Sequence, residues 1–236
     1  MTDPFKFTTI AHTDRFLLGP YSASAITELV PRVQERVLDV GCGKGGVLEV
    51  LGGKGIGIEH NPAFAQEARK RNPNADVWEE DARTSLDRLP WHPNLTVCLG
   101  AAQAVGTPEE ALAKFATLMQ TGSLLLFGDG YWRQKPPSGY LAFLGADESE
   151  MGALDQIPET ARAHGFELVT TRPSTDDEWD DYERSYHRSM LAWCEANADD
   201  PDAAAFRERI IRWRAAYLQW GRDTLGFGIH LLRKSN

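Results

Sequence analysis

The segment that decides the fold is Arg36-Val37-Leu38-Asp39-Val40-Gly41-Cys42-Gly43-Lys44-Gly45-Gly46. Residues 37–40 are apolar apart from Asp39, which is typical of a short strand covered on both faces. The second half of the segment is rich in glycine, which lets a chain turn sharply and lets a ligand approach the backbone. Apolar residues at helical spacing follow. The segment therefore predicts a buried strand, a tight turn and a helix whose first N–H groups are free to meet a polar ligand.

Two cofactor-binding patterns fit this turn. Gly41, Gly43 and Gly46 satisfy the dinucleotide pattern G-x-G-x-x-G, and an acid, Glu59, follows at a suitable distance. An NAD(P)-dependent oxidoreductase is therefore one alternative. Asp39 argues against it, because a carboxylate two residues before the first glycine would repel a pyrophosphate but suits a cation. A strand–helix turn without any ligand is the remaining structural alternative.

The pattern D-x-G-x-G-x-G resembles motif I of the class I S-adenosylmethionine-dependent methyltransferases, and it is complete here at Asp39, Gly41, Gly43 and Gly45. A later Gly-Asp-Gly-Tyr-Trp segment and a Trp/Tyr-rich stretch look like a bacterial branch of small-molecule methyltransferases. The resemblance implies an enzyme that uses S-adenosylmethionine to methylate a small molecule. It also implies that the motif, with Cys42 inside it, contacts the cofactor. A non-catalytic S-adenosylmethionine-binding module is a further alternative, because no acceptor-specific residue is identifiable.

The composition limits the other classes of function. The chain has 236 residues and a net charge of −9 at pH 7, which argues against a general affinity for nucleic acid or an anionic membrane. Its 3 cysteines form no C-x-x-C pair, so we expect a reducing compartment and no metal. The chain has neither an apolar run of membrane-spanning length nor the apolar core of a signal peptide. These features predict one cytoplasmic methyltransferase domain over residues 1–236 and leave its oligomeric state open.

The order of the expected elements resembles the class I methyltransferase fold over residues 22–233. We expect an α/β, Rossmann-like, mostly parallel seven-stranded sheet with the last strand antiparallel and helices on both faces. A helical insertion at residues 173–225, a candidate lid, separates the last two strands. The expected strands are 37–40, 55–59, 76–80, 95–100, 123–128, 166–171 and 226–232. The expected helices outside the insertion are 21–33, 47–51, 63–71, 108–119 and 158–164.

Glu59 is the most specific candidate outside the glycine turn, because it ends the second expected strand. A carboxylate in that place can accept hydrogen bonds from both hydroxyls of a ribose at once. A solvated strand end is the alternative. The neighbouring His60 is a further candidate for cofactor binding.

The resemblance implies three more cofactor contacts after later strands. Asp81 would accept a hydrogen bond from the adenine amino group, and the backbone of Ala82 would reach the adenine ring. Gly100 would lie near the sulfonium. Because Glu79 and Glu80 stand beside Asp81, a shift in register or a plain acidic loop remains an alternative.

Aromatic residues supply the candidates for acceptor binding. Tyr131 and Trp132 follow the fifth expected strand, and ligands bind outside the carboxyl ends of strands in open α/β sheets. Packing against the next loop is their alternative. Within the insertion, aromatic residues recur at helical spacing, and Tyr182 and Tyr186 would face the acceptor if this stripe borders the cleft. A stripe of this kind is more often part of the core.

By resemblance, an N-terminal cap segment, residues 1–34, lies over the cofactor cleft. His12 is then a candidate for the cleft wall, with a surface or capping histidine as the alternative. The family often carries an acid at the start of the fourth strand, whereas this chain has Pro93-Asn94. No catalytic base is therefore assigned, and His12 and His187 remain weak candidates.

Overall fold

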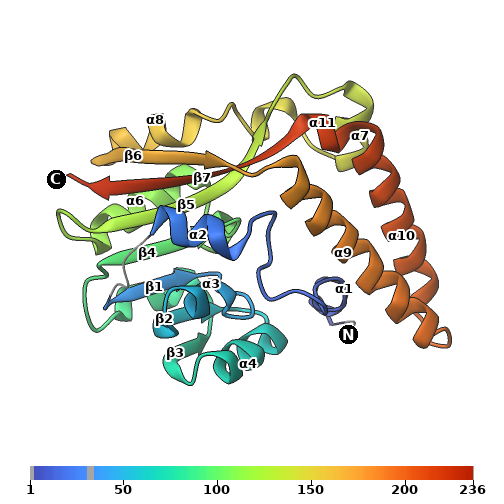
Figure 1. Cartoon of the computed structure of the whole chain (residues 1–236), viewed down its shortest axis with the longest axis horizontal. Helices are drawn as coiled ribbons and strands as arrows, with labels where there is room; N and C mark the ends of the chain where they lie inside the picture. Colours follow the sequence, from blue (N-terminus) through green and yellow to red (C-terminus); the bar gives the residue numbers. More distant parts are fainter. Residues whose placement is uncertain (1–2, 31–34, 236) are drawn as a thin grey trace.

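The computed structural model describes residues 3–30 and 35–235, which form one seven-stranded sheet with helices on both faces (Figure 1). The strands, in order across the sheet, are β3 (Asn74–Glu79), β2 (Lys54–Glu59), β1 (Val37–Val40), β4 (Leu95–Leu99), β5 (Leu124–Trp132), β7 (Leu225–Lys234) and β6 (Phe166–Pro173). Neighbours are parallel except for β7, which runs antiparallel to β5 and to β6. The predicted Rossmann-like sheet with an antiparallel last strand is confirmed.

The helices cover the two faces of the sheet through two apolar clusters. Helices α2 (Ala23–Leu29), α3 (Gly46–Val50) and α4 (Pro62–Arg71) pack on one face, and α5 (Ala82–Ser85), α6 (Pro108–Leu118) and α8 (Gln156–Ala163) pack on the other. Side chains of β1 alternate between the two, with Val37 in the first cluster and Leu38 in the second, as the pleat of a strand requires. The helices are α1 (Lys6–Ala11), α2 (Ala23–Leu29), α3 (Gly46–Val50), α4 (Pro62–Arg71), α5 (Ala82–Ser85), α6 (Pro108–Leu118), α7 (Ser138–Leu144), α8 (Gln156–Ala163), α9 (Asp176–Ala196), α10 (Ala203–Ala216) and α11 (Arg222–Thr224).

The fifth strand is longer than expected. We expected a strand that ends at residue 128, but β5 continues to Trp132, and Tyr131 pairs with Gly226 of β7. A Cβ atom on Gly226 would lie 2.2 Å from the Tyr131 ring, so the ring can lie over residue 226 only because that residue is glycine. Residues 129–132 are therefore sheet and not the start of a loop. The expected helix over 21–33 is described as α2, and residues 31–33 of that expectation lie outside the described residues.

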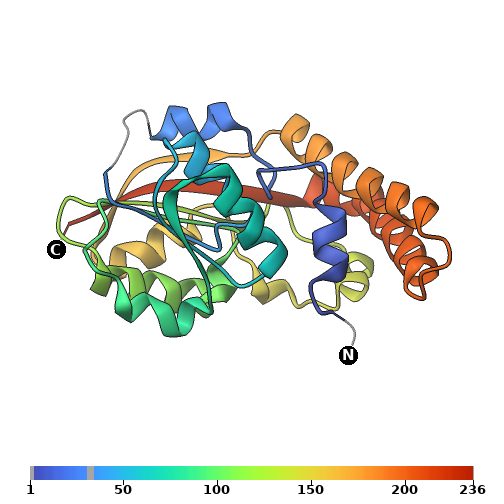
Figure 2. The same cartoon turned by 90° about the horizontal axis from the view of Figure 1, so that it is seen from below.

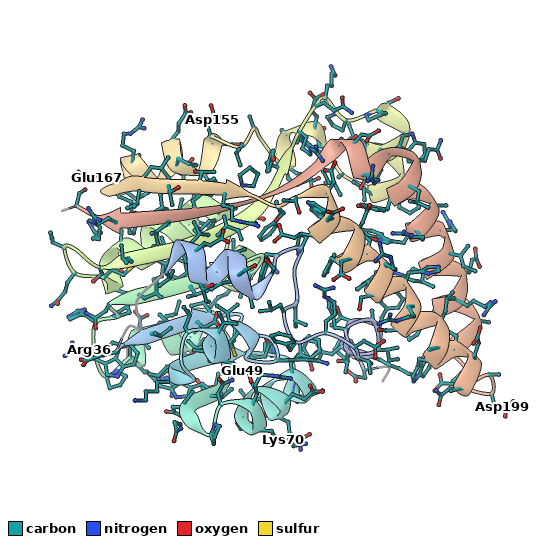
Figure 3. The ribbon with its side chains drawn as sticks, viewed as in Figure 1. Arg36, Glu49, Lys70, Asp155, Glu167 and Asp199 are labelled. Atoms are coloured by element: carbon teal, nitrogen blue, oxygen red, sulfur yellow. The ribbon has the colours of Figure 1, made fainter. Side chains whose placement is uncertain are left out.

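The insertion between β6 and β7 is a helical hairpin beside the sheet. Helices α9 and α10 pack against each other, and Asp199, labelled in Figure 3, lies at the turn between them. Helix α1 packs on α9, and Figure 2 shows it between that hairpin and the sheet. Phe7 and Ile10 of α1 share an apolar cluster with Met190 and Ile210 of the hairpin. The start of the chain and the insertion therefore form one covering layer.

Candidate active site

The glycine turn after β1 is held in a conformation that side chains oppose. Gly41, Gly43 and Gly45 have φ values of 70°, 55° and 72°, in the left-handed region that favours glycine. A Cβ atom on Gly41 would lie 2.4 Å from the Cβ of Ala101. One on Gly43 would lie 2.6 Å from Cδ1 of Leu18. The first two glycines therefore let the β4–α6 connection and the N-terminal segment close on the turn.

Glu59 connects the end of β2 to this turn. Its Oε2 accepts a hydrogen bond from the Gly43 N–H at 2.9 Å, and its Oε1 accepts one from the Asn61 N–H at 2.7 Å. Burial raises the pKa of Glu59, while these two backbone donors act to lower it. Each carboxylate oxygen has a second lone pair, so two further donors can be accepted. The geometry suits the two hydroxyls of a ribose.

A cavity of about 310 Å³ opens at the carboxyl ends of β1, β2, β3 and β4. This volume is at the lower end of the range for small-molecule sites, about 300–1,000 Å³. The cavity brings together most of the residues proposed from sequence for the cofactor, with His12 on the covering side. Those residues are Gly41, Gly43, Glu59, His60, Asp81, Ala82 and Gly100.

Asp39, Cys42 and Gly45 do not line that cavity. Asp39 is only 3% exposed, and its Oδ2 has no hydrogen-bond partner among the residues that the structure describes. Burial, and then the nearby charge of Glu59, raises the pKa of Asp39 to about 8. Asp39 and Cys42 face a separate void of about 30 Å³ behind the turn. Two of the three acids at the strand ends therefore meet in one cavity, and the third lies behind it.

Asp81 lines the cavity after β3 and caps helix α5. Its Oδ1 accepts a hydrogen bond from the Arg83 N–H at 2.8 Å, which makes it the N-cap of α5. Ala82 is the first residue of that helix, and the N–H groups of a first turn have no partner within the helix. Glu80 also lines the cavity, where its carboxylate pairs with Arg88. This end combines acceptor oxygens with a free backbone donor, as recognition of an adenine edge requires.

Lys44 fastens the N-terminal segment over the turn. Its side chain is buried, and its Nζ donates to the carbonyl oxygens of His12 at 2.8 Å and Thr13 at 3.2 Å. The same atom lies 3.4 Å from Oε2 of Glu67. This role was not predicted from the sequence, since nothing in the local pattern separates Lys44 from a solvated lysine. Through Lys44, the cofactor-side turn and the covering segment form one unit.

His12 links the cavity to the helical hairpin. Its Nδ1 lies 2.8 Å from the Thr8 carbonyl oxygen, so Nδ1 carries the proton and donates. Its Nε2 then accepts from the Tyr182 hydroxyl of α9 at 3.2 Å. Burial lowers the pKa of His12 to about 4, so the imidazole is neutral near pH 7. His12 is thus buried in the wall of the cavity and is not a surface histidine.

The other aromatic and histidine candidates lie outside the cavity. Trp132 is buried against Tyr140, and its indole N–H donates to the Glu148 carbonyl oxygen at 2.9 Å. Tyr131 lies over Gly226, and His187 lies on α9, where burial lowers its pKa. None of the three is brought to the cofactor cavity.

The aromatic stripe of α9 packs mainly inside the cover. Tyr182 and Tyr186 are stacked with ring centroids 6.0 Å apart, and Tyr186 lies 5.1 Å from the His12 ring. The Tyr186 ring also contacts Phe7 of α1. The stripe therefore holds α1 against α9, and it reaches the cavity only through His12.

A sheet of this order, with a glycine turn after β1 and an acid after β2, defines a class I methyltransferase fold. Residues 14–171 match the family model described as a methyltransferase domain, and the chain belongs to that family. The predicted class, an S-adenosylmethionine-dependent methyltransferase, is confirmed. The oxidoreductase alternative is wrong, because the same glycine turn lies within the methyltransferase match.

Known structures share the whole architecture. An S-adenosylmethionine-dependent methyltransferase from Geobacter sulfurreducens, solved in complex with S-adenosyl-L-homocysteine, superposes with a TM-score of 0.89 at 24% identity, covering 99% of this chain and 100% of that one. One from Thiobacillus denitrificans, in the same kind of complex, also gives 0.89, at 22% identity, with 99% and 100% covered. The uncharacterized protein YjhP of Escherichia coli (strain K12) is 26% identical over 95% of this chain and 96% of its own length.

Two absences concern the described residues only. Over residues 3–30 and 35–235, no helix has both the length and the apolar character needed to cross a membrane. In the same part of the chain, no group of three His, Cys, Asp or Glu side chains is placed to hold a metal ion.

Proposed function

We propose that this chain transfers the methyl group of S-adenosylmethionine to a small-molecule acceptor, with the nucleoside bound in the cavity around Glu59. The observation that carries the assignment is the Glu59 carboxylate, held by the Gly43 and Asn61 N–H groups with lone pairs left for a ribose. The acidic lining formed by Glu59, Glu80 and Asp81 suits a cationic ligand. The same acidic lining would repel the phosphate backbone of a nucleic acid, which argues against a nucleic acid as the acceptor.

The residues present fit the cofactor at three points. Asp81 and the Ala82 N–H would hold the adenine, and Glu59 would hold the ribose. The glycine turn would let the rest of the molecule pass close to the backbone, since Gly41 and Gly43 carry no side chain to block it. When bound, the sulfonium supplies an activated methyl: the acceptor lone pair forms a bond to carbon as the carbon–sulfur bond breaks and leaves S-adenosylhomocysteine.

The protein's own part in this step is to orient and to exclude water. Orientation of two reactants can lower a barrier by up to about 7–11 kcal/mol. The N-terminal segment, which Lys44 holds to the glycine turn and α9 supports from behind, borders the cavity and would limit the access of water to a bound cofactor. An acceptor that enters protonated must lose its proton. Nε2 of the neutral His12 is the candidate to accept it, through Tyr182.

Calorimetric titration of the full chain with S-adenosylhomocysteine tests the cofactor site. Saturable binding is expected, and Glu59→Gln is expected to weaken it about 10- to 100-fold, because hydrogen bonds to charged groups contribute about 1.5–3 kcal/mol. Glu79→Gln is the matched control, since Glu79 ends β3 and pairs with Arg69 away from the cavity. No binding at millimolar concentration would overturn the proposal.

Methyl transfer itself needs a second measurement. Incubation with methyl-labelled S-adenosylmethionine and a fractionated metabolite extract is expected to label a small molecule. Cofactor binding without any labelled product would favour the alternative of a non-catalytic binding module.

A further inference from the structure

A second, larger cavity lies between the N-terminal segment and α9. Its volume is about 510 Å³, well inside the range of small-molecule sites. One wall is the chain between α1 and α2, residues 14–23, and the other is the first half of α9, residues 177–188. In Figure 1 these two walls are the loop before α2 and the upper part of α9.

This cavity is joined to the cofactor cavity by the small void behind the glycine turn. The void shares Phe16, Leu17 and Tyr21 with the second cavity. It shares Leu18, Gly41 and Gly43 with the cofactor cavity. The void lies beside the Leu17–Leu18 step of the covering segment. Methyl transfer to a molecule in the second cavity would require its nucleophile to reach the cofactor through this void.

Most charges around the second cavity are already paired. Arg15 binds Asp181 at 2.7 Å and lies over the Tyr182 ring, and Arg188 lies 3.3 Å from Asp14. The Glu178 carboxylate accepts from Arg172 and from Ser22. These pairs hold the N-terminal segment against α9 and set the shape of the cavity.

Two opposite charges in the wall, both on exposed residues, have no such partner. Among the described residues, neither Arg184 nor Asp177 forms an ion pair or a side-chain hydrogen bond. Both lie on one face of α9, about 10 Å apart along its axis at 1.5 Å per residue. The buried Ser185 and Tyr21 add two hydroxyls to the lining, and neither is hydrogen-bonded to another described side chain. The cavity lining thus contains an unpaired cation, an unpaired anion and the hydroxyl groups of Ser185 and Tyr21.

We propose that this cavity is the acceptor site and that it selects a zwitterionic molecule, an amino acid or a similar compound with separated ammonium and carboxylate groups. Arg184 binds the carboxylate, and Asp177 binds the ammonium. Because an ammonium has no lone pair, methylation at this nitrogen first requires the loss of a proton to solvent. The role of the cavity as an acceptor site rests on the proposed methyl transfer. Binding of a zwitterion there depends only on α9 and the N-terminal segment, which form the cavity.

Calorimetry with compounds of one length tests the charge requirement. The full chain is titrated with 6-aminohexanoate, hexylamine and hexanoate, with and without saturating S-adenosylhomocysteine; 4-aminobutyrate and 8-aminooctanoate then vary the charge separation. At least one amino acid of the series is expected to bind about fivefold or more tighter than the amine and the acid, the effect of about 1 kcal/mol for one added ion pair. Equal binding of hexylamine and the amino acids, or no saturable binding of any amino acid, would overturn the inference.

Charge-removing variants locate the site. Arg184→Gln is expected to weaken binding of the amino acid about fivefold and leave binding of hexylamine unchanged. Asp177→Asn is expected to weaken binding of the amino acid by the same factor and leave binding of hexanoate unchanged. Arg212→Gln on α10 and Asp199→Asn at the hairpin turn are matched controls on the far side of the cover. Equal effects of variants and controls would overturn the assignment. Binding of S-adenosylhomocysteine by all four variants separates this outcome from a failure of the cofactor site.

Discussion

Gly41→Ala tests whether the glycine turn is shaped by the chain that closes on it. The new methyl group would lie 2.4 Å from the Cβ of Ala101, at a φ of 70°. The left-handed backbone costs about 1–2 kcal/mol for a residue with a Cβ. Overpacking against a fixed neighbour adds about 1–3 kcal/mol. The turn cannot easily move away, because the Gly41 N–H donates to the Ile58 carbonyl oxygen at 2.9 Å.

Gly145→Ala is the matched control for the backbone contribution. Gly145 has a φ of 66°, and no atom lies within 4 Å of the place that a Cβ atom would take there. This variant should therefore lose only the cost of the left-handed backbone, about 1–2 kcal/mol. Urea unfolding of both variants measures the difference in the free energy of unfolding. We expect Gly41→Ala to be less stable than Gly145→Ala by about 1–3 kcal/mol.

Ligand binding gives the second measurement on the same pair. Gly41 and Ala101 both line the cofactor cavity, so the added methyl takes space from it. We expect Gly41→Ala to bind S-adenosylhomocysteine at least tenfold more weakly, about 1.4 kcal/mol, and Gly145→Ala to bind it normally. Equal stability and equal affinity of the two variants would refute the argument that contact with Ala101 determines the turn.

Three other predictions concern buried charges. Lys44→Met should speed hydrogen exchange in residues 12–18 and cost about 1–3 kcal/mol, because two carbonyl oxygens lose their donor; unchanged exchange would contradict it. Burial raises the pKa of Glu183 from 4.5 to about 7, so its contribution to stability is complete below pH 4.5 and is lost as pH rises through 7. Glu183→Gln should therefore be nearly neutral at pH 5 and stabilise by up to about 3 kcal/mol at pH 8 in urea titrations, and a gain that is equal at both pH values would count against this. The His12 ring, with its pKa lowered to about 4 by burial, should show no NMR titration between pH 5.5 and 8, and an inflection there would contradict the burial of the ring.

Local chemistry made much of the fold readable from the sequence. The bounds of β1 match the expected residues 37–40, since its four residues are buried and a glycine follows at once. Ser22 caps α2 and Asn61 caps α4 before Pro62, as their types predict. Glu59 could be proposed for the site because a carboxylate at the end of the second strand can accept hydrogen bonds from both hydroxyls of a ribose.

Contacts between distant segments could not be read in the same way. The extension of β5 depends on pairing with β7, which lies far along the chain. Lys44 binds the carbonyl oxygen of His12, 32 residues away in the sequence. Tyr182 contacts His12 because α1 packs on α9. The position of Asp39 behind the turn follows from the pleat of β1, and motif spacing alone does not distinguish it from a lining position.

The cover and the sheet beneath it come from different stretches of the chain, and polar contacts join them, among them Lys44 with His12, Asn61 with Thr9 and Arg172 with Glu178. If the second cavity is the acceptor site, a change in the charges along α9 would alter the acceptor and leave the residues around Glu59 unchanged. Catalogues of relatives sorted by their glycine turn would then group enzymes with unlike substrates, whereas sorting by α9 would group them by chemistry.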